Sequence, residues 1–442
     1  MISIGNTHKS HGVHPPENKK SRTKKIKNAL LPKQVILPVS QHIGAPAKPL
    51  VTIGDNVKTG QKIAEAGGFV SAPIHATISG KVTKIIQTVS SVTSKIGDAI
   101  VIESDEKDTW IKLHQTKNPT KLTNDELLKL IQDAGIVGLG GATFPTHVKL
   151  QPPPEKKIDT IIVNGCECEP YITSDHRLML EHGDEIIKGL QIMMKIIGCH
   201  NAFIAIENNK PDAVQNLQGL VKNVEKTNQK INVSPLETQY PMGAEKTLLK
   251  RLLGREVPIG GLPMDVGVVV QNVSTLYAIY DAVYNGKPLV ERVVTVSGEV
   301  NEPKNLLARF GTSAEDLINQ CGGMNADANV MIFGGPMMGI SQAQLTTPIQ
   351  KGTNSILVIK NDKPLESNCI RCGSCIETCP MGLMPMMYVA LVKKRMYHEL
   401  KEYYVENCVE CGSCAYGCPA KIPMVQYIKV GKAELQKMRV KK

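Results

Sequence analysis

Apolar residues recur along this chain at two different spacings, and the places where the spacing changes divide it into regions. Between about residues 32 and 104, β-branched residues alternate with polar ones around glycine-containing turns, which is typical of short strands. From about residue 120 the apolar period becomes helical. Thr123 and Glu126 predict a capping box ahead of LLKLIQDAG, and Gly135 predicts the end of that helix. The pattern indicates a compact β unit followed by a domain that opens with a helix.

Apolar runs and helical patterns alternate in the next part of the chain. The runs IDTIIVN, AFIAIE, INVSPLE and VGVVVQ predict strands, and the stretches from about Ser174 to Ile197 and from 211 to 225 predict helices. A further helix is expected from about Val273 to Tyr284, ended by Gly286. This alternation predicts a parallel sheet with helices on its faces. A smaller mixed unit follows from about 288 to 345, with ERVVTVSGEV, a helix start at Ser313 and VMIFGGPMMG.

Composition and length narrow the class of protein. The chain has 442 residues, 42% of them apolar, which is enough for several hydrophobic cores. The richest apolar segment, VGVVVQNVSTLYAIYDAVY, is interrupted by Gln271, Asn272 and Asp281, so no run reaches the roughly 18 residues that a membrane crossing needs. The start MISIGNTHKSHGVHPP lacks the apolar core of a secretory signal. We therefore expect a multidomain soluble protein that stays in the cytoplasm.

The net charge of +11 is concentrated near the two ends, in Lys19–Lys27 and Lys432–Lys442. Such runs form solvated, frayed tails, or they are attracted to an anionic membrane face or an acidic partner. No aromatic residues interleave with them, so nucleic acid is not expected as a partner.

The strongest chemical signal is a cysteine motif that occurs twice. CIRCGSCIETCP and CVECGSCAYGCP share the spacing CxxCxxCxxxCP, in which the first three thiolates can converge on one cluster and the fourth belongs to the other. This pattern assigns one 4Fe–4S cluster to Cys369, Cys372, Cys375 and Cys418, and a second one to Cys408, Cys411, Cys414 and Cys379. Zinc is the alternative metal, but zinc-binding motifs separate two CxxC pairs by a longer spacer. Cys166 and Cys168 are expected to be packing residues.

A glycine-rich loop, GLGGATFP, precedes the predicted parallel sheet. It does not fit a dinucleotide fold, because Thr143 stands where the third glycine belongs and the loop follows a helix instead of a strand. Three later segments change its interpretation. VNGCECEPYITSDHR follows a predicted strand and includes Glu167 and Glu169. YPMGAEKTLL opens a helix, where free backbone amides can meet an anion, and NVSTL repeats that arrangement.

In order and spacing, these four segments resemble the flavin- and NADH-binding subunit of respiratory NADH dehydrogenases. The segment GVHPP, the barrel-sandwich-like halves VTIGDNVKTGQKIAE and APIHATISGKV, and the paired cysteine motifs extend the resemblance to essentially the whole chain. Together they resemble the C subunits of Rnf complexes, the ion-translocating ferredoxin:NAD oxidoreductases. No lysine occupies the hairpin between the two halves, so the β unit is expected to carry no biotinyl or lipoyl group.

The resemblance implies noncovalent FMN and a set of contacts for it. The FMN residues are Gly138, Gly140, Gly141, Lys149, Asn164, Gly243, Asn272 and Thr275. Glycines let backbone amides approach the flavin and its phosphate, Lys149 supplies positive charge, and asparagines can bond the ribityl hydroxyls. The resemblance also implies that Phe144, Glu169 and Glu245 contact NAD(H). The chain departs from the family at Thr143 and in the MGAE tract, and its two-cluster unit replaces a single-cluster domain.

These observations predict a multidomain α/β architecture. Its parts are a basic arm (1–31), a barrel-sandwich hybrid (32–115), an FMN/NADH-binding α/β domain (116–286), a β-grasp-like mixed α+β domain (287–350), a ferredoxin-like helical two-cluster domain (360–430) and a basic tail (431–442). The implied function is hydride exchange between NAD(H) and FMN, followed by one-electron transfer with the two clusters. The expected partners are the other subunits of a membrane-bound complex and, indirectly, ferredoxin, at the cytoplasmic face. A soluble flavin and iron–sulfur cobalamin reductase and an electron-transfer scaffold without nucleotide binding are the alternatives.

Overall fold

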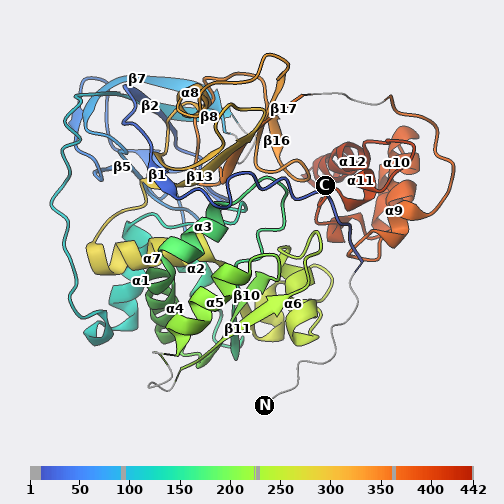
Figure 1. Ribbon diagram of the computed structural model, residues 1–442, viewed down its shortest axis with the longest axis horizontal. Coiled ribbons are helices and arrows are strands. Elements are labelled where there is room, and N and C mark those ends of the chain that lie inside the picture. The colour runs from blue at the N-terminus through green and yellow to red at the C-terminus, as the bar shows by residue number, and fades with distance from the viewer. Residues whose placement is uncertain (1–10, 91–95, 223, 225–228, 361–364, 441–442) are drawn as a thin grey trace.

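The structure is a computed structural model that describes residues 11–90, 96–222, 224, 229–360 and 365–440. Figure 1 shows three masses: two β units side by side at the top, the α/β domain below them, and the helical C-terminal unit at one side. The segment after residue 10, drawn in dark blue, runs from the C-terminal unit across the α/β domain to the β units. This arrangement confirms the predicted fold class.

The first β unit consists of two small antiparallel sheets, ordered β2-β8-β7-β4 and β3-β5-β6. Alternate residues of these strands are fully buried, including Val35, Leu37, Ile100 and Ile102, so the period-2 pattern of the sequence forms the core between the sheets. The strands are β2 (Gln34–Pro38), β3 (Lys48–Pro49), β4 (Asn56–Val57), β5 (Lys62–Glu65), β6 (Ile74–His75), β7 (Gly80–Val89) and β8 (Ile96–Ser104).

The α/β domain is built on a parallel sheet ordered β11-β10-β9-β12. The predicted capping box of Thr123 and Glu126 opens α1, and Gly286 ends α7 in a left-handed conformation. The elements are η1 (Pro119–Lys121), α1 (Asn124–Asp133), α2 (Thr146–Lys149), β9 (Thr160–Asn164), α3 (Ser174–Glu181), α4 (Gly183–Ile197), β10 (Asn201–Glu207), α5 (Pro211–Val221), β11 (Lys230–Leu236), α6 (Glu245–Leu253), η2 (Pro263–Val266), β12 (Val268–Asn272) and α7 (Val273–Asn285).

The helix predicted from Ser174 to Ile197 is in fact two helices, so that prediction is wrong. The chain leaves helical geometry at His182, where φ is −133° and ψ is 33°. The break lets α4 pack closely against α5, because a side chain at Gly183 would approach Leu220 to 2.7 Å. Tertiary packing therefore overrides a continuous helical period in the sequence.

The second β unit is a six-stranded sheet ordered β1-β14-β13-β17-β15-β16. Two of its strands lie outside the predicted bounds of 287–350, namely β1 in the basic N-terminal segment and β17 beyond residue 350. Its elements are β1 (Ile26–Asn28), β13 (Glu291–Gly298), β14 (Lys304–Arg309), α8 (Ala314–Asn319), β15 (Val330–Phe333), β16 (Ile340–Gln342) and β17 (Ser355–Ile359). Ser313 caps α8 as expected, accepting a hydrogen bond from the Asp316 amide.

The basic segments near both ends are ordered, so the interpretation as frayed tails is wrong for their described residues. Lys19 is buried, and its ammonium donates to the backbone carbonyls of Glu167, Glu169 and Ile172. The second basic segment, up to residue 440, continues helix α12.

The C-terminal unit consists of short helices around the cysteine motifs. These are α9 (Ser374–Glu377), α10 (Pro385–Lys393), η3 (Tyr397–Lys401), η4 (Val405–Asn407), α11 (Ser413–Tyr416) and α12 (Met424–Val440). Within the described residues, none of the helices combines the length and apolar character that a bilayer crossing requires.

Candidate cofactor sites

The eight cysteines of the repeated motif surround two separate hollows. Four of them, Cys379, Cys408, Cys411 and Cys414, line the first, which we call the inner site. The other four, Cys369, Cys372, Cys375 and Cys418, line the second, which we call the outer site. These are the two sets that the spacing predicted, with the fourth cysteine of each motif crossing to the hollow of the other.

The two motifs fold in the same way, which produces a pseudo-twofold pair. Gly373 and Gly412 both have φ of 82° and precede the short helices α9 and α11. Arg371 and Glu410, at matching positions, both have φ of 56°. These left-handed turns direct the first three thiols of each motif to one side, as an iron–sulfur ligand set requires.

The donor chemistry of both hollows fits an iron–sulfur cluster. Apart from thiols, the inner site is lined mainly by apolar side chains such as Leu383, Tyr388 and Val425. Burial there raises the pKa of Cys408 to about 11, so the pocket by itself disfavours the thiolate. A positively charged metal group reverses that preference, because coordination deprotonates the thiol. Among the described residues, no group of His, Cys, Asp and Glu side chains converges as the ligands of a single ion.

Four residues expected around FMN meet at the glycine loop. Thr275 is fully buried at the start of α7, and its hydroxyl accepts a hydrogen bond from the Leu139 amide at 2.9 Å. Gly140 lies so close to Asn272 that an added Cβ would stand 3.3 Å from the asparagine Cβ. Gly141 is exposed, has φ of 115° and has open space where a side chain would project. The backbone at Gly141 is therefore open to a ligand.

Thr143 shows why this loop differs from the dinucleotide motif. Its φ is 51°, a left-handed conformation that is unusual for a β-branched residue, and its hydroxyl is buried without a hydrogen-bond partner. The loop is closed by hydrogen bonds from the Gly138 amide to the Phe144 carbonyl and from the Thr143 amide to the Gly138 carbonyl. The backbone therefore keeps a glycine-type conformation at a cost of about 1–3 kcal/mol.

The carboxyl ends of neighbouring strands bring the two asparagines together. Asn164 ends β9 and Asn272 ends β12, and they are direct partners in the parallel ladder. The Asn164 side chain donates to the Gly243 carbonyl at 2.8 Å, which ties the turn before α6 to the sheet edge. Ligands of open α/β sheets bind at this edge.

Lys149 and Glu245 form an ion pair of 2.6 Å between α2 and the first turn of α6. The family resemblance implied different ligands for them, FMN for Lys149 and NAD(H) for Glu245. The structure makes them neighbours at the rim of one site, where the partly exposed Glu245 can exchange its partner for solvent or a ligand.

Glu169, also expected to contact NAD(H), forms hydrogen bonds with another part of the molecule. Its carboxylate accepts hydrogen bonds from the Met337 and Met338 amides, at 3.1 and 2.8 Å, in the loop between β15 and β16. Burial raises the pKa of Glu169 to about 7, against the lowering effect of those amides. Glu167 is also engaged internally, because it accepts from the Asp175 and His176 amides at the start of α3.

Comparisons with known proteins agree with this geometry. Four family descriptions match successive parts of the chain: the RnfC barrel sandwich hybrid domain (residues 7–107), the Nuo51 FMN-binding domain (131–281), the SLBB domain (293–341) and the 4Fe–4S dicluster domain (368–422). A relative from Clostridium ljungdahlii, the C subunit of a proton-translocating ferredoxin:NAD(+) oxidoreductase complex, is 51% identical over 399 residues, covering 89% of this chain and 86% of its own. The chain belongs to the family of Rnf complex C subunits.

The chain is also similar to a second C subunit and, in fold, to a chain of a hydrogenase. The C subunit of the Na(+)-translocating ferredoxin:NAD(+) oxidoreductase complex of Acetobacterium woodii is 41% identical, covering 87% of both chains. A chain of the NAD+-reducing nickel–iron hydrogenase shares the fold, with a TM-score of 0.50 and 18% identity, over 70% of this chain and 63% of that one.

Asp175 is a functional candidate of the Rnf C subunit that sequence reasoning missed. It is buried under the site, where it accepts from the Asn272 side chain at 2.7 Å and from the Ser274 hydroxyl. Burial and the neighbouring Glu167 raise the pKa of Asp175 to about 6. Its sequence signal was faint, because the acidic residue stands inside a helix start in TSDHR and resembles an ordinary first-turn aspartate.

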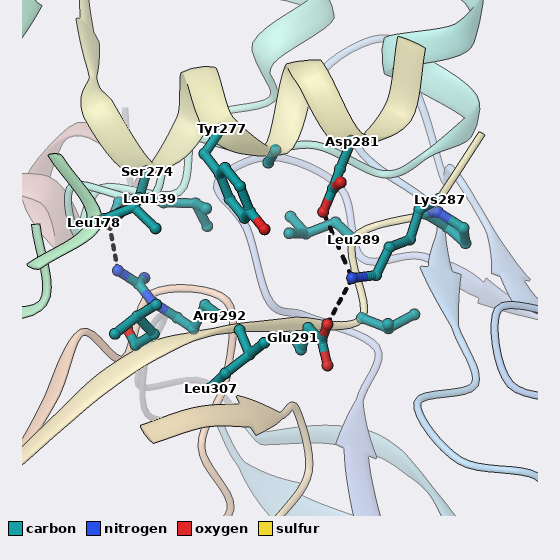
Figure 2. A pocket seen from close by; sticks show the side chains of 14 residues that line it. Leu139, Leu178, Ser274, Tyr277, Asp281, Lys287, Leu289, Glu291, Arg292 and Leu307 are labelled. Atoms are coloured by element: carbon teal, nitrogen blue, oxygen red, sulfur yellow. Dashed lines mark hydrogen bonds and ion pairs between the residues drawn. The ribbon is translucent and has the colours of Figure 1, made fainter. Parts of the chain in front are cut away.

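A third hollow of the Rnf C subunit lies beneath the glycine loop, between α7 and β13 (Figure 2). Arg292 crosses it and donates to the Leu139 carbonyl at 3.0 Å, while Lys287 lies between Asp281 and Glu291. Its free volume of about 30 Å³ has room for about two water molecules, so it is too small for a flavin. The residues around the hollow therefore support the glycine loop. Among them, Arg292 connects that loop to the second β unit.

Proposed function

We propose that this chain is the peripheral electron-transfer subunit of a membrane-bound, ion-translocating ferredoxin:NAD oxidoreductase complex. In that role it exchanges hydride between NAD(H) and FMN and transfers single electrons with two 4Fe–4S clusters. The observation that carries the proposal is the pair of four-thiol hollows on a chain that also bears an open glycine loop at the edge of a parallel sheet. The names of the related C subunits support the same reaction.

FMN supplies the chemistry that connects a two-electron donor to one-electron carriers, since a flavin is stable in three oxidation states. The glycine loop offers backbone amides at Gly140 and Gly141 to the bound group. Asn164 and Asn272 present side-chain amides at the strand ends, and Lys149 supplies positive charge beside them. Thr275 holds the loop through the Leu139 amide and so keeps it in position.

We assign the nicotinamide nucleotide to the solvent side of the same loop. Phe144 is half-buried there and offers an aromatic face for stacking, while Glu245, paired with Lys149 at the rim, has a second carboxylate oxygen that can accept from a ribose hydroxyl. The Glu169 carboxylate instead accepts hydrogen bonds from the Met337 and Met338 amides.

The cysteines hold the clusters in a crosswise arrangement. The inner site would take Cys379, Cys408, Cys411 and Cys414 as thiolate ligands, and the outer site Cys369, Cys372, Cys375 and Cys418. Buried apolar walls around the inner site exclude water, while exposed ligands at the outer site leave that cluster open to a partner.

Other subunits of the complex are the proposed partners, with ferredoxin contacted only through them, and the cytoplasmic face of the membrane is the proposed location. Two relatives carry names that state different ions, protons for one and sodium for the other. We therefore propose ion translocation without naming the ion.

Anaerobic purification, with an absorption spectrum, an iron count and an NADH titration, tests this function. We expect roughly eight iron atoms per chain, a flavin spectrum and loss of flavin absorbance on adding NADH. Flavin that NADH fails to bleach would favour a scaffold without nucleotide binding. Colourless protein without iron or flavin would overturn the proposal.

A further inference from the structure

The inner site is joined to the α/β domain through one buried tyrosine. Tyr240 is only 2% exposed, and its hydroxyl donates to the carbonyl of Cys411 at 2.6 Å. The same hydroxyl lies 3.4 Å from a carboxylate oxygen of Glu169. Cys411 is one of the thiols of the inner site, so a side chain of the α/β domain bonds directly to the backbone of a cluster residue.

Glu169 ties a third unit to the same point. Its carboxylate accepts from the Met337 and Met338 amides, and a side chain at Gly335 would come within 2.2 Å of it, so the loop needs glycine there. The carbonyl of Met337 in turn lies against Gly412, where an added Cβ would approach it to 2.8 Å. Glu169 therefore holds the 335–338 loop against the turn that presents Cys411.

Tyr240 also stands close to the flavin side. It opens the turn that leads to Gly243, whose carbonyl accepts from Asn164 at the strand end. The Gly243 amide donates to the Cys168 thiol, and Cys168 packs with Tyr240 and Cys411 in one apolar cluster. One short turn thus contacts the proposed flavin site at one end and the inner site at the other.

The N-terminal segment clamps this turn from outside. Val13 and Tyr240 exchange both backbone hydrogen bonds, at 2.9 Å each, as an isolated antiparallel bridge. A side chain at Gly12 would come within 2.4 Å of the Tyr240 carbonyl. The tyrosine is therefore fixed by backbone on one side and by the Cys411 carbonyl on the other.

We propose that Tyr240 and Glu169 are positioning residues that hold the inner cluster against the flavin domain and tune its potential, and that Glu169 is not a nucleotide contact. Hydrogen bonds around a cluster and its ligands help to set its reduction potential. A donor at the Cys411 carbonyl withdraws electron density from the ligand and favours the reduced cluster. This inference rests on the proposed function in so far as FMN and the inner cluster are present.

Tyr240→Phe and Glu169→Gln test the inference on the anaerobically purified holoprotein. Phenylalanine keeps the ring and removes only the hydroxyl, while glutamine keeps the shape and loses one of the two acceptor oxygens. Tyr280→Phe is the matched control, because Tyr280 stacks on Tyr284 in α7, away from these contacts. Equal iron and flavin content in all four proteins is the condition for comparison.

Three measurements separate positioning from nucleotide binding. In Tyr240→Phe we expect NADH to reduce the flavin with unchanged KM and rate, while the following reduction of a cluster slows by about fivefold, the effect of losing one hydrogen bond. A redox titration followed by electron paramagnetic resonance should show one cluster shifted to lower potential and the other unchanged. In Glu169→Gln, hydrogen exchange at the Met337 and Met338 amides should rise by about fivefold or more.

A weaker affinity for NADH in Glu169→Gln, with unchanged cluster potential and unchanged amide exchange, would overturn the inference and restore Glu169 as a nucleotide contact. Unchanged potentials in Tyr240→Phe would equally overturn it. If NADH fails to reduce the flavin in the wild type, the proposed function fails. A redox titration with dithionite and the amide exchange measurement still test whether Tyr240 and Glu169 hold the inner site against the α/β domain. If Tyr240→Phe loses iron, amide exchange in Glu169→Gln decides, and if Glu169→Gln loses iron, the cluster potentials of Tyr240→Phe decide.

Discussion

The inner and outer sites are built from the same motif but lie in different surroundings. At the inner site, Cys379, Cys411 and Cys414 are each 7% exposed, and the neighbouring Gly412 packs on the second β unit. At the outer site, Cys375 and Cys418 are also buried, but Cys369 and Cys372 are exposed, and Ile370 between them is 68% exposed. The same motif therefore produces one site with no exposed ligand and one site with two exposed ligands.

This difference shows that the motif determines how a cluster is held, while its surroundings determine what the cluster can contact. Each site has its ligands on matching turns, so the geometry of ligation is the same. Tyr240 of the α/β domain donates a hydrogen bond to the inner site, at the Cys411 carbonyl. We expect electrons to move between the flavin and the inner cluster, and between the outer cluster and a partner subunit.

Removing one ligand from each site should give the largest contrast. In Cys411→Ala, iron should fall from roughly eight to roughly four atoms per chain, and NADH should reduce the flavin but no longer the outer cluster, a loss of about 100-fold or more in rate. In Cys369→Ala, NADH should still reduce the inner cluster. Rapid mixing with NADH and an iron assay measure both. Cys199→Ala, at a buried thiol outside both sites, is the control. If the two ligand variants behaved alike, the proposed order of electron transfer, from the flavin to the inner cluster and then to the outer cluster, would be wrong.

Chelator resistance should differ between the sites by about tenfold. Ligands that solvent can reach are more open to oxidation and metal exchange. Under mild oxidation with a chelator, we expect half of the iron to leave quickly and half slowly. The fast phase should be missing from Cys369→Ala. Iron release followed by absorbance measures this, and a single phase in the wild type would contradict the difference in burial.

Acid should destabilise the protein through two buried histidines of the first β unit. Burial lowers the pKa of His75 to about 3 and that of His42 to about 4. The unfolded chain binds a proton at each below about pH 6.5 while the folded one does not, so stability is lost as the pH falls below that value, by up to about 1.4 kcal/mol per pH unit for each histidine.

His75→Gln should remove the contribution of one of the two histidines to the change of the free energy of unfolding with pH. Fluorescence of Trp110, the single tryptophan, reports on this unit during denaturation, since Trp110 pairs with Thr59. We expect the free energy of unfolding of the variant to fall less steeply between about pH 6.5 and 5, whatever its value at neutral pH. The same slope in both proteins would show that His75 is protonated in the folded state.

The smallest expected effect concerns charge at the inner site. The Lys432 ammonium on α12 donates to the Cys408 carbonyl and pairs with Glu410, both at 2.7 Å. Lys432→Met should lower the inner potential by about 30 mV, because a nearby positive charge stabilises the reduced cluster. Lys437→Met, on the exposed part of the same helix, is the control. A shift of the outer potential instead would mean that the charge acts over a longer range.

Much of the fold could be predicted because its signals are local. The capping box at Thr123, the end of α7 at Gly286 and the cap of α8 at Ser313 each depend on a few adjacent residues. The division of the eight cysteines between two hollows likewise follows from the spacing within two short motifs. Each of these signals lies within one short stretch of sequence, although the fourth cysteine of each motif joins the hollow of the other motif.

Predictions were wrong where a distant partner decides the outcome. The basic N-terminal run contributes strand β1 and the buried Lys19, because β14 and the carbonyls near Glu169 supply its partners. The break at His182 depends on α5, which packs against Gly183. The hydrogen bonds of Glu169 also depend on a loop from another domain, which nothing in CECEP indicates, and its role toward the nucleotide stays a prediction.

The sequence by itself determined most of the elements, the glycine loop and the motif spacing that divides the thiols into two sets, since each of these signals lies within about a dozen adjacent positions. Only the tertiary structure decided which site has exposed ligands, that Glu169 accepts from the Met337 and Met338 amides, and that Tyr240 reaches Cys411. Those features arise where units far apart in the chain share a surface, and burial and hydrogen-bond partners on a shared surface depend on both sides at once.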